Sequence, residues 1–254
     1  MAKPQRVADP ELDLRPDFTN DPKQPTKKGM DIMSALAQDL ALLLLDDNSG
    51  RSTVDIGRRH RAVGSAILLD LVRVGRVAVD RPGGDPKDAR PVVLDAAPTG
   101  DAALDRALSM LTAKDRKLAW AAENIGHACW EPLMEALTGR GLVRHQEGRF
   151  LGLIRTNSWP AEDTSYEASV VDRVRTAVTG EGDRAGDGGP DESTVLLVMI
   201  LNGIGALPAV LPGEDPQAIA ERAGRLVAAQ HDRGPWAEAF KGLDSALITV
   251  LFAG

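Results

Sequence analysis

Apolar residues recur along most of this chain at the three- and four-residue spacing of a helix face. Residues 35–46 read ALAQDLALLLLD, which predicts a helix that ends at the turn residues 47–50. A second long helix is predicted from about Thr53 to Val74, with a largely apolar second half. Gly75 can cap this helix, because glycine adopts a left-handed backbone conformation without strain.

A short β-hairpin is predicted after these two helices. Arg76–Asp80 and Pro91–Asp95 alternate or are rich in β-branched residues, and Pro82-Gly83-Gly84 lies between them. Helical spacing then returns for most of the chain. Further helices are predicted over residues 102–111, 113–138 (with a break near Gly126), 165–178, 194–201, 215–230 and 243–252.

Capping residues indicate where two of these helices begin. Thr112 can cap the helix that follows it, and Thr164 with Glu167 forms a capping box. We therefore expect a mainly α fold, a single helical-bundle domain over residues 31–254 with one protruding β-hairpin and a second short one. Residues 1–30 are rich in proline and charge and are expected to be a disordered tail, and residues 181–193 a mobile, acidic, Gly-rich loop.

The protruding hairpin is predicted from Leu142–His145 and Arg149–Ile154, with Gly148 closing the turn between them. Its second arm contains Phe150, Leu151 and Leu153 and does not alternate, so it has no polar face. Arginines at positions 140, 144, 149 and 155 surround this apolar segment. Apolar side chains ringed by arginine suit an anionic membrane surface, and a buried core strand is the alternative.

The composition is that of an ordinary soluble globular protein, with 43% hydrophobic and 26% charged residues and a net charge of −7. The single cysteine, Cys129, excludes an internal disulfide framework and any multi-cysteine zinc site. The four histidines form no HExxH motif, so we expect no metal site and no cofactor. Cys129 and His127 are two residues apart and would lie on different helix faces. With no GxSxG elbow or phosphate-binding loop either, we expect no enzymatic activity.

No secretory leader is apparent at the beginning of the chain. The most apolar stretch, residues 195–211, is short for a membrane span and is broken by Asn202, two glycines and Pro208. We therefore expect a cytoplasmic protein that is soluble or peripheral to a membrane.

Residues 51–78 form a basic segment inside this acidic chain, with six arginines against two aspartates. Arg58, Arg59 and Arg61, together with His60, come just before the apolar half of the predicted helix. A guanidinium group donates two parallel hydrogen bonds to a phosphate, so this cluster is a candidate phosphate clamp. The alternative is a solvated helix face that offsets acidic neighbours.

Three segments carry a family resemblance. They read LLDLVRVGRV at residues 68–77, APTGDAALDRAL at 97–108 and RGLVRHQEGRFLGLI at 140–154. In this order they resemble segments of the Golgi phosphoprotein three family, whose members are helical peripheral membrane adaptors. The chain uses arginine much more often than lysine, which suggests a bacterial member of the family. The resemblance implies a mainly α domain whose hydrophobic hairpin supports oligomerisation and membrane contact. It also implies a basic pocket for phosphatidylinositol 4-phosphate, and a non-enzymatic role in tethering glycosyltransferase tails to the Golgi membrane.

The residues that the family uses in this pocket are replaced in the chain. The family's pocket tryptophan corresponds to Ile56, its helix arginine to Ser65, and its two later arginines to His127 and Trp130. The resemblance therefore does not identify the lipid. The candidate head-group site consists of Arg58, Arg59, Arg61, Ser65, His127 and Trp130, and the candidate membrane or oligomer contacts are Arg149, Phe150, Leu151 and Leu153.

The leading hypothesis is a peripheral membrane protein that binds anionic phospholipid head groups and acts as an adaptor for a membrane-protein client. A soluble oligomeric scaffold that uses the hairpin for subunit contact is the first alternative. A winged-helix DNA binder is the second, but the helix before the hairpin carries Glu131 and Glu135 against a lone Arg140. Those carboxylates would repel phosphate, so no nucleic-acid partner is expected.

Overall fold

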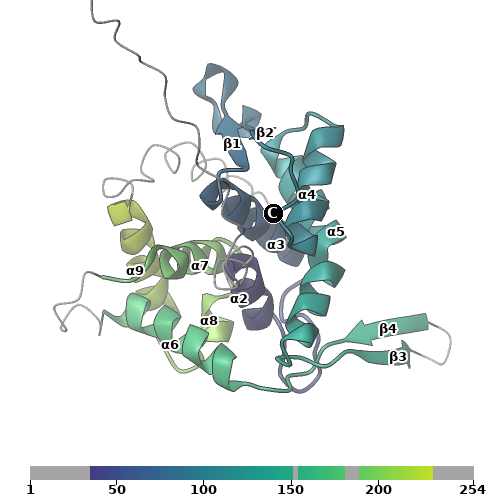
Figure 1. Ribbon diagram of the computed structural model, residues 1–254. Helices are drawn as coiled ribbons and strands as arrows, with labels where there is room; N and C mark the ends of the chain where they lie inside the picture. Colours follow the sequence, from purple (N-terminus) through teal and green to yellow (C-terminus); the bar gives the residue numbers. More distant parts are fainter. Residues whose placement is uncertain (1–34, 151–153, 181–188, 231–254) are drawn as a thin grey trace, which may run out of the picture.

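The computed structural model describes residues 35–150, 154–180 and 189–230, and these ranges form helices with two small antiparallel sheets (Figure 1). The prediction of a mainly α fold with two hairpins is confirmed. The main elements are α2 (Ala35–Leu43), α3 (Ile56–Arg73), β1 (Val77–Asp80), β2 (Arg90–Val93), α4 (Ala102–Ala113), α5 (Leu118–Gly139), β3 (Gln146–Phe150), β4 (Ile154–Ser158), α6 (Ser165–Thr179), α7 (Glu192–Gly203), α8 (Leu207–Val210) and α9 (Pro216–Gln230). The predicted tail, the last predicted helix and most of the predicted acidic loop lie outside the described residues.

The buried α2 lies between two groups of helices (Figure 1). Helices α3, α4 and α5 pack on one side of it, and α6 to α9 on the other. A continuous hydrophobic core joins the two groups, and it is built from leucine, valine, isoleucine and alanine, with few aromatic side chains. Burial of these aliphatic side chains is the main stabilising contribution to the fold.

The closest helix packing is between α3 and α5. A Cβ atom at Gly64 would lie 1.7 Å from the carbonyl oxygen of Ala122, and one at Gly126 would lie 1.8 Å from the carbonyl oxygen of His60. Only glycine permits this approach, so the predicted helix break near Gly126 is wrong: α5 is continuous through that position. The contact also fixes which residues of α3 face which residues of α5.

One predicted helix start and one predicted capping interaction are also wrong. Thr112 lies inside α4, where its hydroxyl donates to the carbonyl of Leu108, and α5 begins only at Leu118. The side chain of Thr164 makes no capping hydrogen bond at the start of α6; Asp163 accepts from the Ser165 N–H at 2.8 Å instead.

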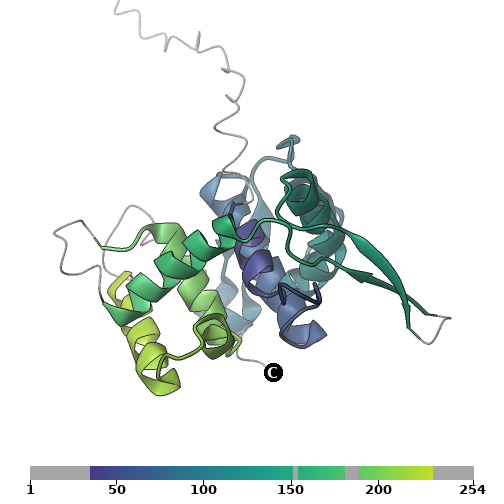
Figure 2. The ribbon, with the colours of Figure 1, turned by 90° about the horizontal axis from the view of Figure 1, so that it is seen from below.

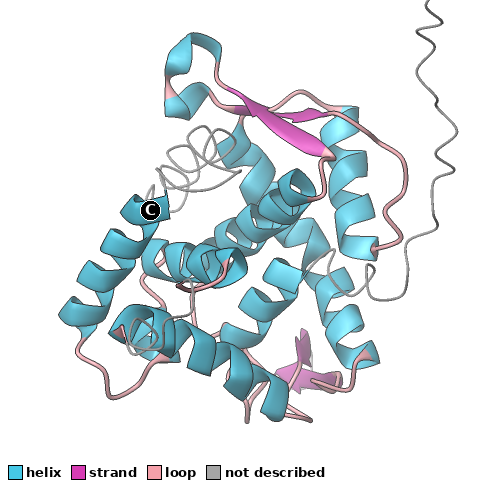
Figure 3. Cartoon of the chain, turned by 60° about the vertical axis from the view of Figure 1, so that its left-hand side comes forward, coloured by secondary structure: helices cyan, strands magenta, loops and turns pink. Residues whose placement is uncertain are grey.

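The hairpin β3–β4 projects away from the helices, on the side of the molecule opposite α6 to α9 (Figure 2). Its pairing differs from the prediction: Gln146 pairs with Ser158 and Gly148 with Thr156, so Gly148 is a strand residue. The bridge between Val143 and Ala161 continues the same register on the side of the helices. The shorter hairpin β1–β2 pairs Val77 with Val93 and lies at the other end of the molecule (Figure 3).

Candidate anion-binding site

The candidate site forms where the first turns of α3 cross the middle of α5. Asp55 caps α3 by accepting from the Arg58 N–H at 2.9 Å, and this hydrogen bond holds the pKa of Asp55 below its usual value. The same carboxylate pairs with Arg58 Nε at 3.1 Å, and Arg58 Nη1 also reaches the carbonyl of Ile204 at 3.5 Å. Arg58 is therefore partly neutralised within the protein.

Arg59 is placed differently from Arg58. Its guanidinium lies over the ring of Trp130, 4.2 Å from the centroid, which is a cation–π contact between α3 and α5. Its Nε is buried without a hydrogen-bond partner, and burial lowers the pKa of Arg59 because the charged form is poorly solvated. Within the described ranges Arg59 forms no ion pair with a carboxylate.

Arg61 shares this lack of a counter-charge. Its Nε is also buried without a partner, and in the described part of the chain it makes no ion pair. The charge of Arg61 helps to lower the pKa of Asp55, but the Asp55 carboxylate is already bonded to Arg58. Arg59 and Arg61, two of the three predicted clamp arginines, can therefore donate guanidinium N–H groups to an anion.

A pair of histidines lies beside Arg59. The rings of His60 on α3 and His127 on α5 are 5.0 Å apart between centroids and tilted by 60°. His127 is exposed and His60 is partly buried. Burial lowers the pKa of His60, as do the charges of Arg59 and His127, whereas Glu123 acts in the opposite direction.

Two predicted site residues lie beneath this surface rather than on it. Ser65 is 0% exposed and Trp130 is 7% exposed, so Ser65 does not reach the surface and Trp130 serves as the platform under Arg59. The Ser65 hydroxyl and the Trp130 indole N–H have no hydrogen-bond partner among the described residues. Ile56, the counterpart of the family's pocket tryptophan, is 64% exposed at the start of α3.

An aromatic row connects the site to the base of the hairpin. Trp159 meets Trp130 edge-on with ring centroids 6.1 Å apart, and it stacks on His145 at 5.6 Å, immediately before β3. The sequence analysis missed Trp159, because this contact joins segments far apart in the chain. Its backbone N–H donates to the carbonyl of Gly50 at 2.9 Å, which fixes the exit of the hairpin against the turn after α2.

The predicted hairpin contacts remain untested. Arg149 and Phe150 are the last two residues of β3, and Leu151 and Leu153 lie outside the described residues. The backbone of Arg149 and Phe150 pairs with that of Arg155 and Ile154, at the end of the ladder farthest from the helices (Figure 2).

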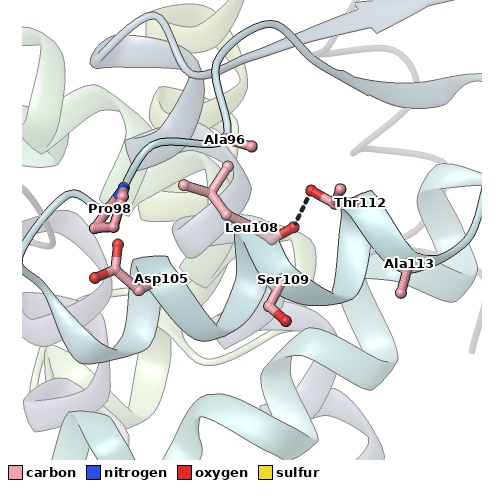
Figure 4. A pocket seen from close by; sticks show the side chains of 7 residues that line it. All are labelled: Ala96, Pro98, Asp105, Leu108, Ser109, Thr112 and Ala113. Carbon is pink, nitrogen blue, oxygen red and sulfur yellow. Dashed lines mark hydrogen bonds between the residues drawn. The ribbon is translucent and has the colours of Figure 1, made fainter.

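The segment APTGD has a structural role. The Asp105 carboxylate accepts from the N–H of Thr99 at 2.6 Å and from its hydroxyl at 2.7 Å, and Asp101 caps α4 through the N–H groups of Ala103 and Leu104. A shallow pocket of about 450 Å³ beside this turn is lined mainly by small and apolar side chains, with Asp105 at one end (Figure 4). Because Asp105 is bonded to the turn, this pocket offers a ligand little polar chemistry.

The described ranges contain neither a cluster of metal ligands nor a membrane-spanning helix. No three His, Cys, Asp or Glu side chains among these residues gather so that they could hold a metal ion. None of the helices described there has both the length and the apolar character that a membrane crossing requires.

The sequence profile of the family described as Golgi phosphoprotein 3 (GPP34) matches residues 36–241. The chain belongs to this family. The GPP34 match contains the helix crossing of the candidate site and both hairpins. No curated protein matches the chain.

Proposed function

We propose that this GPP34 protein is a non-enzymatic, cytoplasmic peripheral membrane protein that binds anionic phospholipid head groups. Arg59 and Arg61 would hold the phosphate, with His127 beside them, and the hairpin would enter the membrane interface. The observation that carries the proposal is Arg59, held on Trp130 and without a counter-charge in the described part of the chain. A role as adaptor for a membrane-protein client belongs to the proposal and rests on the family alone.

Attraction to the bilayer would have to come from several weak contributions. Each arginine near an anionic surface contributes about 1 kcal/mol, and each apolar side chain that enters the interface about 1.5–3 kcal/mol. Ring contacts run from Trp130, buried under Arg59, through Trp159 to His145, and they join the arginine cluster to the base of the hairpin. Both contributions can therefore act on the same membrane.

Vesicle flotation tests this proposal. We expect the full chain to float with vesicles that contain phosphatidylglycerol and to remain in solution with neutral phosphatidylcholine vesicles. The double variant Arg59→Gln/Arg61→Gln loses two membrane-facing charges, so its affinity should fall about thirtyfold, which corresponds to about 2 kcal/mol.

A matched control is Arg116→Gln, which also removes an arginine that lies over a tryptophan, here Trp120 at 5.3 Å. Arg116 precedes α5, away from the crossing with α3, so this variant should bind as the unaltered protein does. Equal recovery of the unaltered protein with anionic and neutral vesicles would overturn the proposal.

A second candidate is a soluble oligomeric scaffold. The projecting hairpin favours it, because within the described residues β3 and β4 pair only with each other and leave strand edges open to a second copy (Figure 2). The mass in solution with and without the hairpin distinguishes the two candidates.

A further inference from the structure

His60 and His127 come together because the backbones of α3 and α5 touch. Gly126 lies against the carbonyl of His60, and Gly64 lies against Ala122, so the two helices cannot move apart or slide without losing this contact. The two imidazole rings project from this crossing at a centroid distance of 5.0 Å, beside Arg59. The crossing thus holds two titratable donors next to the guanidinium that lacks a counter-charge.

The contact between Arg59 and His60 is favourable only for one charge state of the histidine. Arg59 Nη2 lies 3.5 Å from His60 Nε2. A guanidinium has only donors, so His60 Nε2 must accept in this contact, which requires a neutral imidazole. Protonation of His60 would remove that acceptor and leave two positive groups facing one another.

An anion between these groups resolves this repulsion. Phosphate oxygens can accept from a guanidinium and from two imidazolium N–H groups at once, and charge-assisted hydrogen bonds of this kind are stronger than neutral ones. We propose that His60 is a further ligand-binding residue of the anion site, beside His127, and that it takes up a proton when a phosphate group binds. This inference rests on the proposed function and adds that head-group binding strengthens as the pH falls.

The charged groups around the pair set the direction of the effect. On α3 these are Arg58, Arg59 and Arg61, and on α5 they are Glu123 and Glu131, one helical turn before and after His127. Trp159, in the connection between β4 and α6, lies against Trp130, and the titratable His145 stacks on Trp159. Burial and the neighbouring positive charges lower the pKa of His60 in the free protein, and Glu123 offsets them in part.

A bound phosphate adds negative charge and therefore raises the pKa of His60 above its value in the free protein. A group whose pKa is higher in the bound state carries more protons in the bound state than in the free state. The affinity therefore rises as the pH falls through the pKa of the bound state, and it levels off below the pKa of the free state. Histidine titrates near pH 6.5 in water and the pKa of His60 in the free protein lies below that value, so the gain is expected to develop as the pH falls from about 7.5 to about 5.5 and to continue below.

Vesicle affinity at these two pH values tests the inference. Phosphatidylglycerol is the probe, because its diester phosphate keeps a single negative charge over the whole range. The affinity of the full chain should rise about tenfold from about pH 7.5 to about pH 5.5, the effect of one pKa unit of linkage. The double variant His60→Gln/His127→Gln should lose this gain, so that the ratio of its affinities at the two pH values is close to one.

A second experiment with sulfate in solution distinguishes a site for free anions from a site for lipid head groups. Sulfate keeps its full charge over this pH range. The pKa of His60, followed by NMR of its ring C–H, should rise when phosphatidylglycerol vesicles are present. An equal rise with sulfate alone would assign the site to free anions rather than to head groups.

The two proposals fail in different ways. If the unaltered protein binds phosphatidylglycerol vesicles equally at both pH values, or if the double histidine variant keeps the full gain, the inference is overturned while the proposed function stands. If no vesicle binding occurs at either pH, the proposed function is overturned as well. A thermal melt of the variant shows whether a loss of the gain reflects unfolding.

Discussion

Arg58, Arg59 and Arg61 are close in sequence and have different surroundings. The sequence predicted them as one clamp from their spacing, but it could not show that Asp55 holds Arg58 while Trp130 holds Arg59. Such partners belong to other turns or other helices, and a single sequence does not reveal which of them meet. Ser65 is the clearest example, because the family position predicted a head-group contact and helix packing buries it completely.

Asp70 is a second residue whose surroundings determine its chemistry. It is buried near the end of α3, where its carboxylate accepts from the Ala37 N–H at 3.0 Å and faces Arg73 at 3.5 Å. Burial outweighs both partners and raises the pKa of Asp70 to about 8. The unfolded chain has a pKa of about 3.9 at this position, so the folded state binds the proton more tightly.

This difference predicts a loss of stability as the pH rises. The contribution from protonated Asp70 is complete below about pH 4 and disappears as the pH approaches about 8, because the unfolded chain then ionises more readily. Asp70→Asn keeps an oxygen acceptor for Ala37 and cannot ionise. Its melting temperature should therefore change less between about pH 5 and about pH 8 than that of the unaltered protein, as measured by circular dichroism. An identical pH dependence in the two proteins would contradict this account.

The helices were predictable because their apolar spacing is a local property of the sequence. The hairpin β3–β4 was recognised, but its register was wrong: residues 146–148 were predicted to form the turn, and they are strand residues that pair with residues 156–158. The register continues in the bridge between Val143 and Ala161, which no local pattern shows. Likewise, Gly126 was predicted to interrupt a helix, whereas it permits a neighbouring helix to approach.

The crossing of α3 and α5 leads to a stability prediction. In Gly64→Ala the new Cβ would lie 1.7 Å from the carbonyl oxygen of Ala122, a backbone atom that cannot move without separating the helices. We expect this change to lower the free energy of unfolding by about 3 kcal/mol, as measured by urea denaturation.

Gly224→Ala is the matched control, because it lies in α9 with nothing within 4 Å of the added Cβ. Alanine is the better helix former, so this change should raise the stability by up to about 1 kcal/mol. Similar behaviour of the two variants would mean that the helices are not in close contact.

In the whole molecule, the compact helical body and the projecting hairpin are separable parts. Replacing residues 148–156 with Asn-Gly would join Glu147 to Asn157, a facing pair of the ladder, through a tight turn. His145 and Trp159 remain in this variant, so the base of the hairpin should be preserved.

If the hairpin enters a membrane, this variant should lose about tenfold or more in vesicle affinity, since one inserted apolar side chain contributes about 1.5–3 kcal/mol. If the hairpin joins subunits, the variant should have a lower mass in solution than the unaltered protein, and its vesicle affinity should stay the same. Flotation and light scattering on the same preparation measure both quantities.

The glycine contact between α3 and α5 has one more consequence for recognition. Since Gly64 and Gly126 lock the two backbones together, the groups that would meet an anion are preorganised. A ligand then does not have to order the receptor, and less of the interaction energy is lost as conformational entropy. Association should accordingly be fast and accompanied by little change in backbone hydrogen exchange along these helices.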